Sequence, residues 1–370
     1  MFSISIPVCG QAEYLPTALE SLRVQSCPFQ LAVLDATPNN SVQVILDRYR
    51  DIINYGYHYP DAGQSMAIQE GWNNTSGEIV AWLNADDYYF PDTFAMVEKV
   101  FRERPDVDVV FGHGVYVTAD NVFQMYFPAI SENITLLKKG CTICQPSCFV
   151  RRTAMEKVGG LDTSLQYTMD WDFWLRLYKF DSTFYFIDYP ISVVRVYNDT
   201  KTLSRSKKRY YEITNILKDN TNWFNQKKSL ILFYHYDLSH NKKGLVDFFV
   251  CTVLSFFRYF LRPIEKKPVI KGLECWTNYI KEQCQILLPW YSTKVPDTVS
   301  ITVDRCADIS LTFLGKEVHL DLCDQDVESL GDEKKCCTYK AKLNGFSGNL
   351  IVLNLRSNDG PLRLISLNII

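Results

Sequence analysis

Residues 79–87 read Ile-Val-Ala-Trp-Leu-Asn-Ala-Asp-Asp, and this stretch decides the fold. The short apolar run Ile79–Leu83, bounded by polar residues, predicts a buried strand. Asn84–Asp87 follows the strand directly and predicts a polar turn. Pro91 and the spacing of the apolar residues over 94–101 then predict a helix. The stretch therefore belongs to a unit of strand, polar turn and helix.

The same unit is expected three times upstream. The expected strands are Phe2–Ile6, Leu31–Leu34 and Ile53–Tyr59, and the helices that follow them are Pro16–Leu22, 42–49 and Met66–Trp72. This alternation with short connections predicts an α/β fold with a mostly parallel sheet and helices on both faces. Val107–Val117 and Val122–Phe127 predict a hairpin, which would make the sheet mixed.

Acidic residues follow several of the expected strands. Asp35, Asp61 and the pair Asp86-Asp87 each lie within four residues of the end of a strand. Ligands of open α/β sheets bind beyond the carboxyl ends of the strands. An acidic edge there suits a divalent cation or the hydroxyls of a nucleotide, although a single Asp in such a place often only caps the next helix.

Two phosphate-binding loops are absent from the sequence. Neither G-x-x-x-x-G-K-[ST] nor a G-x-G-x-x-G after the first strand occurs. A bound diphosphate would then be neutralised by a metal on carboxylates rather than by a backbone cradle. This combination indicates a nucleotide-diphosphate sugar rather than ATP hydrolysis or dinucleotide redox chemistry.

Five ordered segments carry a family resemblance over about residues 2–205. They are Ile6–Leu15, Pro60–Ser65 with Gly71 and Gly77, Trp82–Asp87 with Pro91, Gln145–Ser147, and Gly159–Asp162 with Met169–Leu177. In these segments the chain resembles the family 2 glycosyltransferases, whose fold is called GT-A. The resemblance implies a GT-A catalytic domain over residues 1–205.

The resemblance also implies roles for single residues. It places Asp86 on a Mn²⁺ or Mg²⁺ ion, and it makes Asp170 the catalytic base. The implied nucleotide-binding residues are Pro7, Glu13, Asp35, Asp61, Gln64, Asn84 and Lys201. Two positions depart from the family pattern: Asn84 replaces the first Asp of the D-x-D element, and Tyr197 replaces the His of R-x-H. Three alternatives stay open: Asp170 as a helix N-cap, Asp172 as the base, and Lys201 as a solvated surface lysine.

The implied function is inverting, metal-dependent transfer of a sugar from a nucleotide-diphosphate donor to an acceptor hydroxyl of a glycan or glycolipid. A non-catalytic sugar-binding relative and a nucleotidyltransferase are the alternatives. A nucleotidyltransferase would be expected to carry a basic, glycine-rich segment after the first strand, and Gly10–Glu13 is neither.

The charge changes along the chain. Residues 1–200 hold 14 basic and 24 acidic side chains, whereas residues 201–281 hold 16 and 6. We expect a basic helical segment over 206–295 and a small β-rich module over 296–370. The apolar run Leu245–Leu261 has lysines and arginines at both ends. It predicts peripheral membrane contact near a lipid-linked acceptor. The alternative is that it packs against the catalytic domain or against a second subunit in a homodimer. Nucleic acid is not an expected partner, because the basic residues alternate with large aliphatic ones and form no known module.

The compartment is predicted from two absences in the sequence. No apolar run reaches the roughly 18 to 20 residues of a membrane span. Residues 1–5 have no basic region and no long apolar stretch, so we expect no secretory signal and a cytoplasmic protein, at most at the cytoplasmic face of a membrane. The twelve cysteines are accordingly expected to be free thiols.

Overall fold

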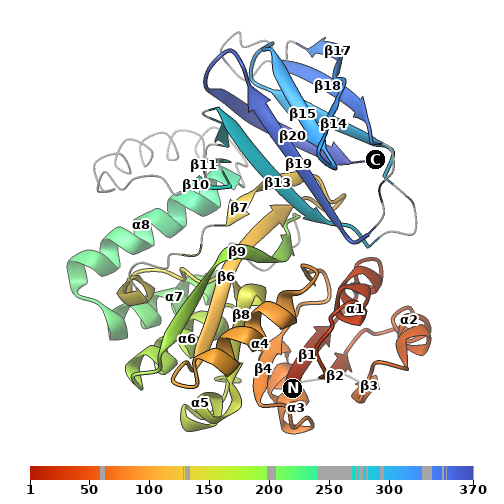
Figure 1. The fold of residues 1–370 in the computed structure, drawn as a ribbon. Coiled ribbons are helices and arrows are strands. Elements are labelled where there is room, and N and C mark those ends of the chain that lie inside the picture. The colour runs from red at the N-terminus through yellow and green to blue at the C-terminus, as the bar shows by residue number, and fades with distance from the viewer. Residues whose placement is uncertain are drawn as a thin grey trace.

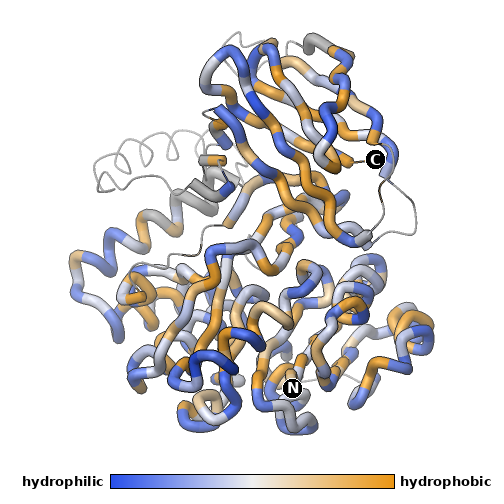
Figure 2. The backbone as a smooth tube through the Cα atoms, viewed as in Figure 1, coloured by the Kyte–Doolittle hydropathy of each residue, from blue (hydrophilic) through white to orange (hydrophobic). Residues whose placement is uncertain are grey.

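The chain folds into an N-terminal α/β part and a C-terminal β-rich part that pack against each other (Figure 1). The computed structural model describes residues 1–58, 63–127, 129, 134–197, 206–240, 269–271, 273–274, 278–280, 282–291, 296–326, 336–343, 346 and 348–369. Figure 2 shows apolar residues concentrated along the central strands of both parts.

Four parallel strands form one half of the N-terminal sheet, in the order β3-β2-β1-β4. Their bounds are β1 Phe2–Val8, β2 Phe29–Asp35, β3 Tyr55–His58 and β4 Ile79–Trp82. The register pairs Val8 with Asp35 and Asp35 with His58, so the carboxyl ends of three strands lie at one edge. The four predicted strands are confirmed in place and in direction.

The other half of the sheet is mixed. The predicted hairpin is confirmed as β6 (Val109–Val117) and β7 (Phe123–Phe127). Three further strands were not predicted: β5 (Tyr88–Tyr89), β8 (Cys148–Arg151), which is antiparallel to β4 and β6, and β9 (Phe184–Arg195), which is parallel to β6. The short β5 (Tyr88–Tyr89) pairs with the end of β9, which brings Arg195 beside the turn that follows β4.

Helices cover both faces of this sheet, as predicted (Figure 1). Their bounds are α1 Leu15–Arg23, α2 Gln43–Leu46 with a 3-10 turn at Asp47–Tyr49, α3 Gln64–Asn73, α4 Thr93–Glu103, α5 Arg152–Lys157 and α6 Met169–Lys179. Trp72 of α3 and Trp174 of α6 pack with Trp82 in a buried cluster on one face. Gly71 lets α3 approach the sheet, because a Cβ there would overlap the Ser5 hydroxyl.

The basic segment is only partly helical. Its helices are α7 (Lys207–Asn220) and α8 (Trp223–His240). The expectation of helix is wrong further on, where the structure has the strands β10 Val269–Ile270, β11 Leu273–Glu274, β12 Tyr279–Ile280 and β13 Gln283–Pro289. β13 is a strand because it pairs along its whole length with a strand that lies some 70 residues later in the chain. The residues of β13 themselves do not reveal that partner, so the strand could not be predicted locally. Leu245–Leu261 lies outside the described residues, and no described helix is long and apolar enough to span a membrane.

The C-terminal strands form two sheets that enclose a core. One sheet has the order β13-β19-β15-β16, and β14, β17, β18 and β20 belong to the other. The bounds are β14 Thr298–Val303, β15 Ile309–Phe313, β16 Lys316–Val318, β17 Asp321–Asp326, β18 Cys336–Lys342, β19 Leu350–Ser357 and β20 Leu362–Ile369. The sequence pattern predicts five strands in this module, over 300–303, 309–313, 318–322, 350–355 and 362–369, and four of them are confirmed as β14, β15, β19 and β20. The prediction of one continuous strand over 318–322 is wrong, because β16 ends at Val318 and β17 starts at Asp321.

The β-rich module shares its core with the α/β part. Tyr88, Phe90 and Phe123 are buried in one cluster with residues of β11 to β20. The Tyr126 hydroxyl donates to the Gln285 carbonyl at 2.9 Å and accepts from the Leu287 N–H at 3.0 Å. The division into three domains stays a prediction, but the module is firmly packed on the α/β part.

The expectation that all cysteines are free is wrong at one pair. Cys306 and Cys337 form a disulfide, and the eight other described cysteines are free. Val303 at the end of β14 lies opposite Cys337 on β18, which brings Cys306 to it. The two residues are 31 positions apart, so their proximity comes from strand pairing that the sequence spacing does not show.

Candidate active site

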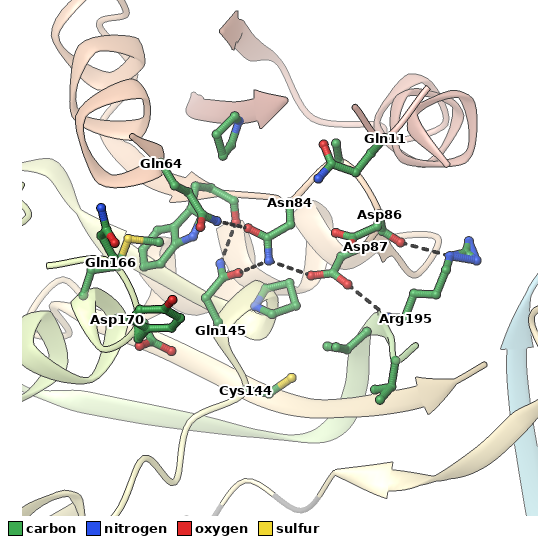
Figure 3. A pocket seen from close by; sticks show the side chains of 18 of the residues that line it. Gln11, Gln64, Asn84, Asp86, Asp87, Cys144, Gln145, Gln166, Asp170 and Arg195 are labelled. Carbon is green, nitrogen blue, oxygen red and sulfur yellow. Dashed lines mark hydrogen bonds between the residues drawn. The ribbon is translucent and has the colours of Figure 1, made fainter. Parts of the chain in front are cut away.

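A cavity of about 520 Å³ opens at the carboxyl ends of β1 and β4, and its size is typical of a small-molecule site. Five of the predicted site residues line it: Pro7, Gln64, Asn84, Asp86 and Asp170. They come from β1, α3, the turn after β4, and α6 (Figure 3). The fold therefore gathers side chains that are up to 163 positions apart in the sequence.

A chain of amide and carboxylate hydrogen bonds crosses one wall of the cavity (Figure 3). Gln64 donates to Asn84 Oδ1 at 2.8 Å, and Asn84 Nδ2 donates to Asp87 at 2.9 Å and to Gln145 at 3.1 Å. Gln145 in turn donates to the Trp82 carbonyl at 2.9 Å. Asn84 is thus held rigidly, with its amide in a fixed orientation.

Asp87 is also a lining residue, but its side chain is only 3% exposed. One carboxylate oxygen accepts from Asn84, and the other accepts the Arg195 backbone N–H at 3.0 Å. Burial raises the pKa of Asp87 well above its usual range, and the neighbouring Asp86 carboxylate raises it further. Asp87 therefore joins the turn after β4 to the end of β9.

Asp86 presents a partly buried carboxylate at the cavity wall. Its Oδ2 accepts the Tyr197 hydroxyl at 2.8 Å, and the Arg195 guanidinium donates to its backbone carbonyl at 3.3 Å. Burial raises the pKa of Asp86, while the Tyr197 hydrogen bond and the Arg195 charge lower it. Tyr197 thus occupies the position where the family resemblance leads one to expect a His ligand, and it contacts the acid instead.

The donor set around Asp86 fits a weakly held cation. Among the described residues there is no group of three or more His, Cys, Asp or Glu side chains that could hold a metal ion. One desolvated carboxylate at the wall of a diphosphate-sized cavity fits an ion that takes its remaining oxygen ligands from the bound nucleotide and water. The site does not fit a permanent, all-protein metal centre.

Asp170 is in the first turn of α6, facing the cavity. Its Oδ1 accepts the Trp171 N–H at 2.7 Å, and the Cys141 thiol lies 3.9 Å from Oδ2. Burial raises the pKa of Asp170 to about 6. The rival base Asp172 is outside the cavity lining, and its carboxylate is paired with Arg176 at 2.8 Å.

Four predicted nucleotide-binding residues are not placed at the cavity. Asp35 is fully buried, accepts the Thr37 N–H at 2.9 Å and lies 2.6 Å from His58 Nδ1. Glu13 is exposed, and neither it nor Asp35 lines the cavity. Asp61 and Lys201 lie outside the described residues.

Sequence reasoning missed Arg209, which lines the cavity and is only 7% exposed. It lies on α7, beyond the stretch that carries the family resemblance. The only sequence signal was the basic character of residues 201–281, which does not single out one residue. Cys141 and Gln166, also in the lining, were not given a role in the site either.

Residues 3–159 match the family model described as Glycosyl transferase family 2. The chain is therefore similar to this family over residues 3–159. The resemblance predicted from the sequence and the α/β, GT-A fold class of this family 2 domain are thereby confirmed.

Curated relatives and solved structures resemble the chain at low identity. An uncharacterized glycosyltransferase of Rickettsia typhi is 25% identical over 216 residues, which are 55% of this chain and 65% of that protein. A PGL/p-HBAD biosynthesis glycosyltransferase of Mycobacterium bovis is 29% identical over 213 residues, covering 56% of this chain and 80% of the relative. The crystal structure of S. aureus TarS 1-349 in complex with UDP-GlcNAc is 16% identical with a TM-score of 0.49, covering 71% of this chain and 81% of that one. The match to the Rickettsia protein thus spans slightly less than two thirds of its length.

Proposed function

We propose that this protein is an inverting glycosyltransferase that moves a sugar from a nucleotide-diphosphate donor to a hydroxyl of a glycan or glycolipid. One observation carries the proposal: Asp86 and Asp170, the two acids that the family pattern requires, line a single cavity, which is built partly from the stretch that matches the family 2 model. Such a cavity is large enough for a nucleotide sugar.

Asp170 acts as the general base in this proposal. A carboxylate with a pKa of about 6 is largely ionised at neutral pH and is more basic than an ordinary Asp, so it accepts a proton effectively. The acceptor oxygen bonds to the anomeric carbon while its proton moves to Asp170. The bond from the anomeric carbon to the diphosphate oxygen breaks on the opposite face. A single displacement of this kind inverts the anomeric centre.

Asp86 would hold a Mn²⁺ or Mg²⁺ ion in this proposal. The cation, when bound, supplies stabilisation of the negative charge that develops on the departing diphosphate. Tyr197 orients the Asp86 carboxylate through its hydroxyl, and Arg195 fixes the backbone of the same turn. These two residues keep the acid facing the cavity.

The remaining predicted residues bind the nucleotide in this proposal. Pro7, Gln64 and Asn84 form the cavity wall, and Glu13, Asp35, Asp61 and Lys201 keep the roles that the family resemblance implies. The Asp35 carboxylate is fully buried and contacts His58, so any influence of Asp35 on the nucleotide would pass through that partly exposed side chain.

A donor screen tests the proposal. Purified protein is incubated with several nucleotide sugars, with Mn²⁺ or Mg²⁺, and the release of nucleoside diphosphate is followed with and without glycan acceptors. A transferase releases nucleoside diphosphate with at least one donor and loses this activity in D170N. A sugar-binding relative binds donors without turnover, and a nucleotidyltransferase releases pyrophosphate from a sugar phosphate and a nucleoside triphosphate.

Contact with a membrane at its cytoplasmic face is part of the proposal, with a lipid-linked acceptor. The run predicted for this contact is outside the described residues, but α8 begins with Trp223 and Phe224, which are 71% and 65% exposed. Lys227 lies 6.0 Å from the Trp223 ring, and Lys228 follows it. Exposed aromatic rings beside lysines suit the surface of an anionic bilayer. Packing of this surface in a homodimer is the alternative.

A further inference from the structure

Glu212 on α7 is buried against the loop that leads into α6. The side chain is only 4% exposed. Its Oε1 accepts the Gln166 N–H at 3.1 Å, and its Oε2 accepts the N–H groups of Tyr167 at 2.8 Å and Thr168 at 3.2 Å. The Thr168 hydroxyl donates to the same oxygen at 3.2 Å. One carboxylate therefore binds three consecutive residues of the loop.

These three residues end two positions before Asp170. The N-cap of α6 is Thr168, whose hydroxyl is bonded to Glu212 and does not cap its own helix. Amide groups at the start of a helix need acceptors from outside the helix, and a buried carboxylate is a strong acceptor for N–H donors. Glu212 thus anchors the N-cap amide of α6 and the two loop amides before it from another helix, while the first turn of α6 has its own acceptor in Asp170.

A second tether holds the other side of Asp170. The Trp171 indole N–H donates to the Leu137 carbonyl at 2.6 Å. Asp170 is therefore fixed between Glu212, which holds the chain before it, and Trp171, which holds the chain after it. The orientation of the Asp170 carboxylate into the cavity depends on both points.

We propose that Glu212 is a positioning residue for the catalytic base, and that α7 thereby completes an active site that the family 2 domain alone does not contain. The inference rests on the proposed function, in which Asp170 accepts the proton. Glu212 does not line the cavity and has no contact with the reacting atoms. Misplacement of a catalytic group by about 1 Å lowers a rate on the order of 10²-fold.

The test compares E212Q and E212A with D219N in the full chain. Asp219 is an exposed acid on the same helix, so D219N removes the same charge without touching the loop. Turnover, donor KM, thermal unfolding and hydrogen exchange of the amides at 166–168 are measured for each. We expect D219N to match the wild type and E212A to lose kcat by ~10²-fold with an unchanged donor KM. E212Q should lose less, because its amide oxygen still accepts while its NH₂ group faces N–H donors.

Hydrogen exchange separates positioning from general stability. Exchange at 166–168 should accelerate in E212Q at temperatures where the variant stays folded, together with the fall in kcat. If E212A fails to fold, E212Q alone decides the point. Wild-type kcat in a folded E212Q with accelerated exchange overturns the proposal, as does a fall in kcat without any change in exchange.

The proposed function fails in a different way. If D170N turns over like the wild type, Asp170 is not the base, whatever the Glu212 variants do. If D170N is inactive and E212A is fully active, the proposed function stands and the role of Glu212 does not.

Discussion

Replacement of Asp170 by Asn should stabilise the fold while it removes activity. Burial raises the pKa of this carboxyl from 3.8 to about 6. Between these values the folded protein keeps a proton that the unfolded chain has released. Ionisation of Asp170 therefore opposes folding as the pH rises, and the effect is fully developed above about pH 6.

The size of the effect follows from the two pKa values. A shift of about two units at 1.36 kcal/mol per unit gives about 3 kcal/mol of lost stability at pH 7, and about 1.6 kcal/mol at pH 5. Asn carries no charge and still offers an oxygen to the Trp171 N–H, so D170N should recover most of this free energy. With an unfolding entropy of about 2.1 cal/mol/K per residue, 3 kcal/mol corresponds to a rise in Tm of about 4 °C for a chain that unfolds as one unit.

The assay combines denaturation with kinetics across pH. Urea or thermal unfolding of the wild type and D170N is measured at pH 5 and pH 7, and donor turnover is measured from pH 5 to 8. D170N should be the more stable protein, with a larger advantage at pH 7, and should lose ~10²- to 10⁴-fold in turnover. Wild-type turnover should rise with pH and level off above about 6.

Asp172 provides the matched control on the same helix turn. Its carboxylate is paired with Arg176 at 2.8 Å and is outside the cavity lining. D172N should keep turnover and should gain no stability. A D170N protein that is less stable than the wild type at pH 7 would refute the argument from burial. An inactive D172N beside an active D170N would show that the base is assigned to the wrong acid.

Three further predictions follow from the same structure. Excess EDTA, or the change Asp86→Asn, should lower transfer by ~10²-fold or more, and full turnover in either case would contradict a cation on this acid. A chain that ends at Tyr291 should be insoluble or unfolded, because β13 loses its partner β19 and Tyr126 is left against an incomplete core. Expression and circular dichroism would show this. A folded, stable product would mean that the α/β part does not need the module. The double change Trp223→Ala with Phe224→Ala should reduce flotation with anionic vesicles at low salt, and a wild-type protein that stays at the bottom of the gradient is not a membrane binder.

The parallel half of the sheet was predictable because its determinants are local. Each strand there is a short apolar run followed by a polar turn and an amphipathic helix, and all four were found in the sequence. β9 was missed although it is the longest strand of the N-terminal α/β part. Its residues Phe184–Arg195 lack alternation, and Pro190 is in their middle, where a register shift against β6 accommodates it.

Non-local pairing explains most of the remaining differences. β13 was read as helix, and its partner β19 lies more than 60 residues later in the chain. β18 was not seen, and it pairs with β14 more than 30 residues earlier as well as with the nearer β17. The Cys306–Cys337 disulfide depends on the same pairing. Local propensity contains none of this information, so these elements could not be derived from patterns in the sequence.

Site residues could be predicted from the sequence only where a motif surrounds them. Asp86 and Asp170 were predictable because motifs surround them, and the structure brings both to one cavity. Arg209 and Glu212 were not, because both are on a helix with no motif of its own and reach the site only through tertiary packing. The two residues can be recognised once their burial is known, because a charged side chain that is less than a tenth exposed needs specific partners.

Burial of acids is the common physical feature of this site. It raises the pKa of Asp86, Asp87 and Asp170 alike, so in each case the surroundings favour the neutral acid. Asp87 satisfies both oxygens with N–H donors from Asn84 and Arg195, which suits a structural role. Asp170 has the Trp171 N–H on one oxygen and the long, weak contact from the Cys141 thiol at 3.9 Å on the other, and the Tyr197 hydroxyl donates to one oxygen of Asp86, so each acid keeps capacity for a further partner at the cavity. The difference in hydrogen bonding, more than the shared burial, is what separates the two acids that can act on a substrate from the one that holds the site together.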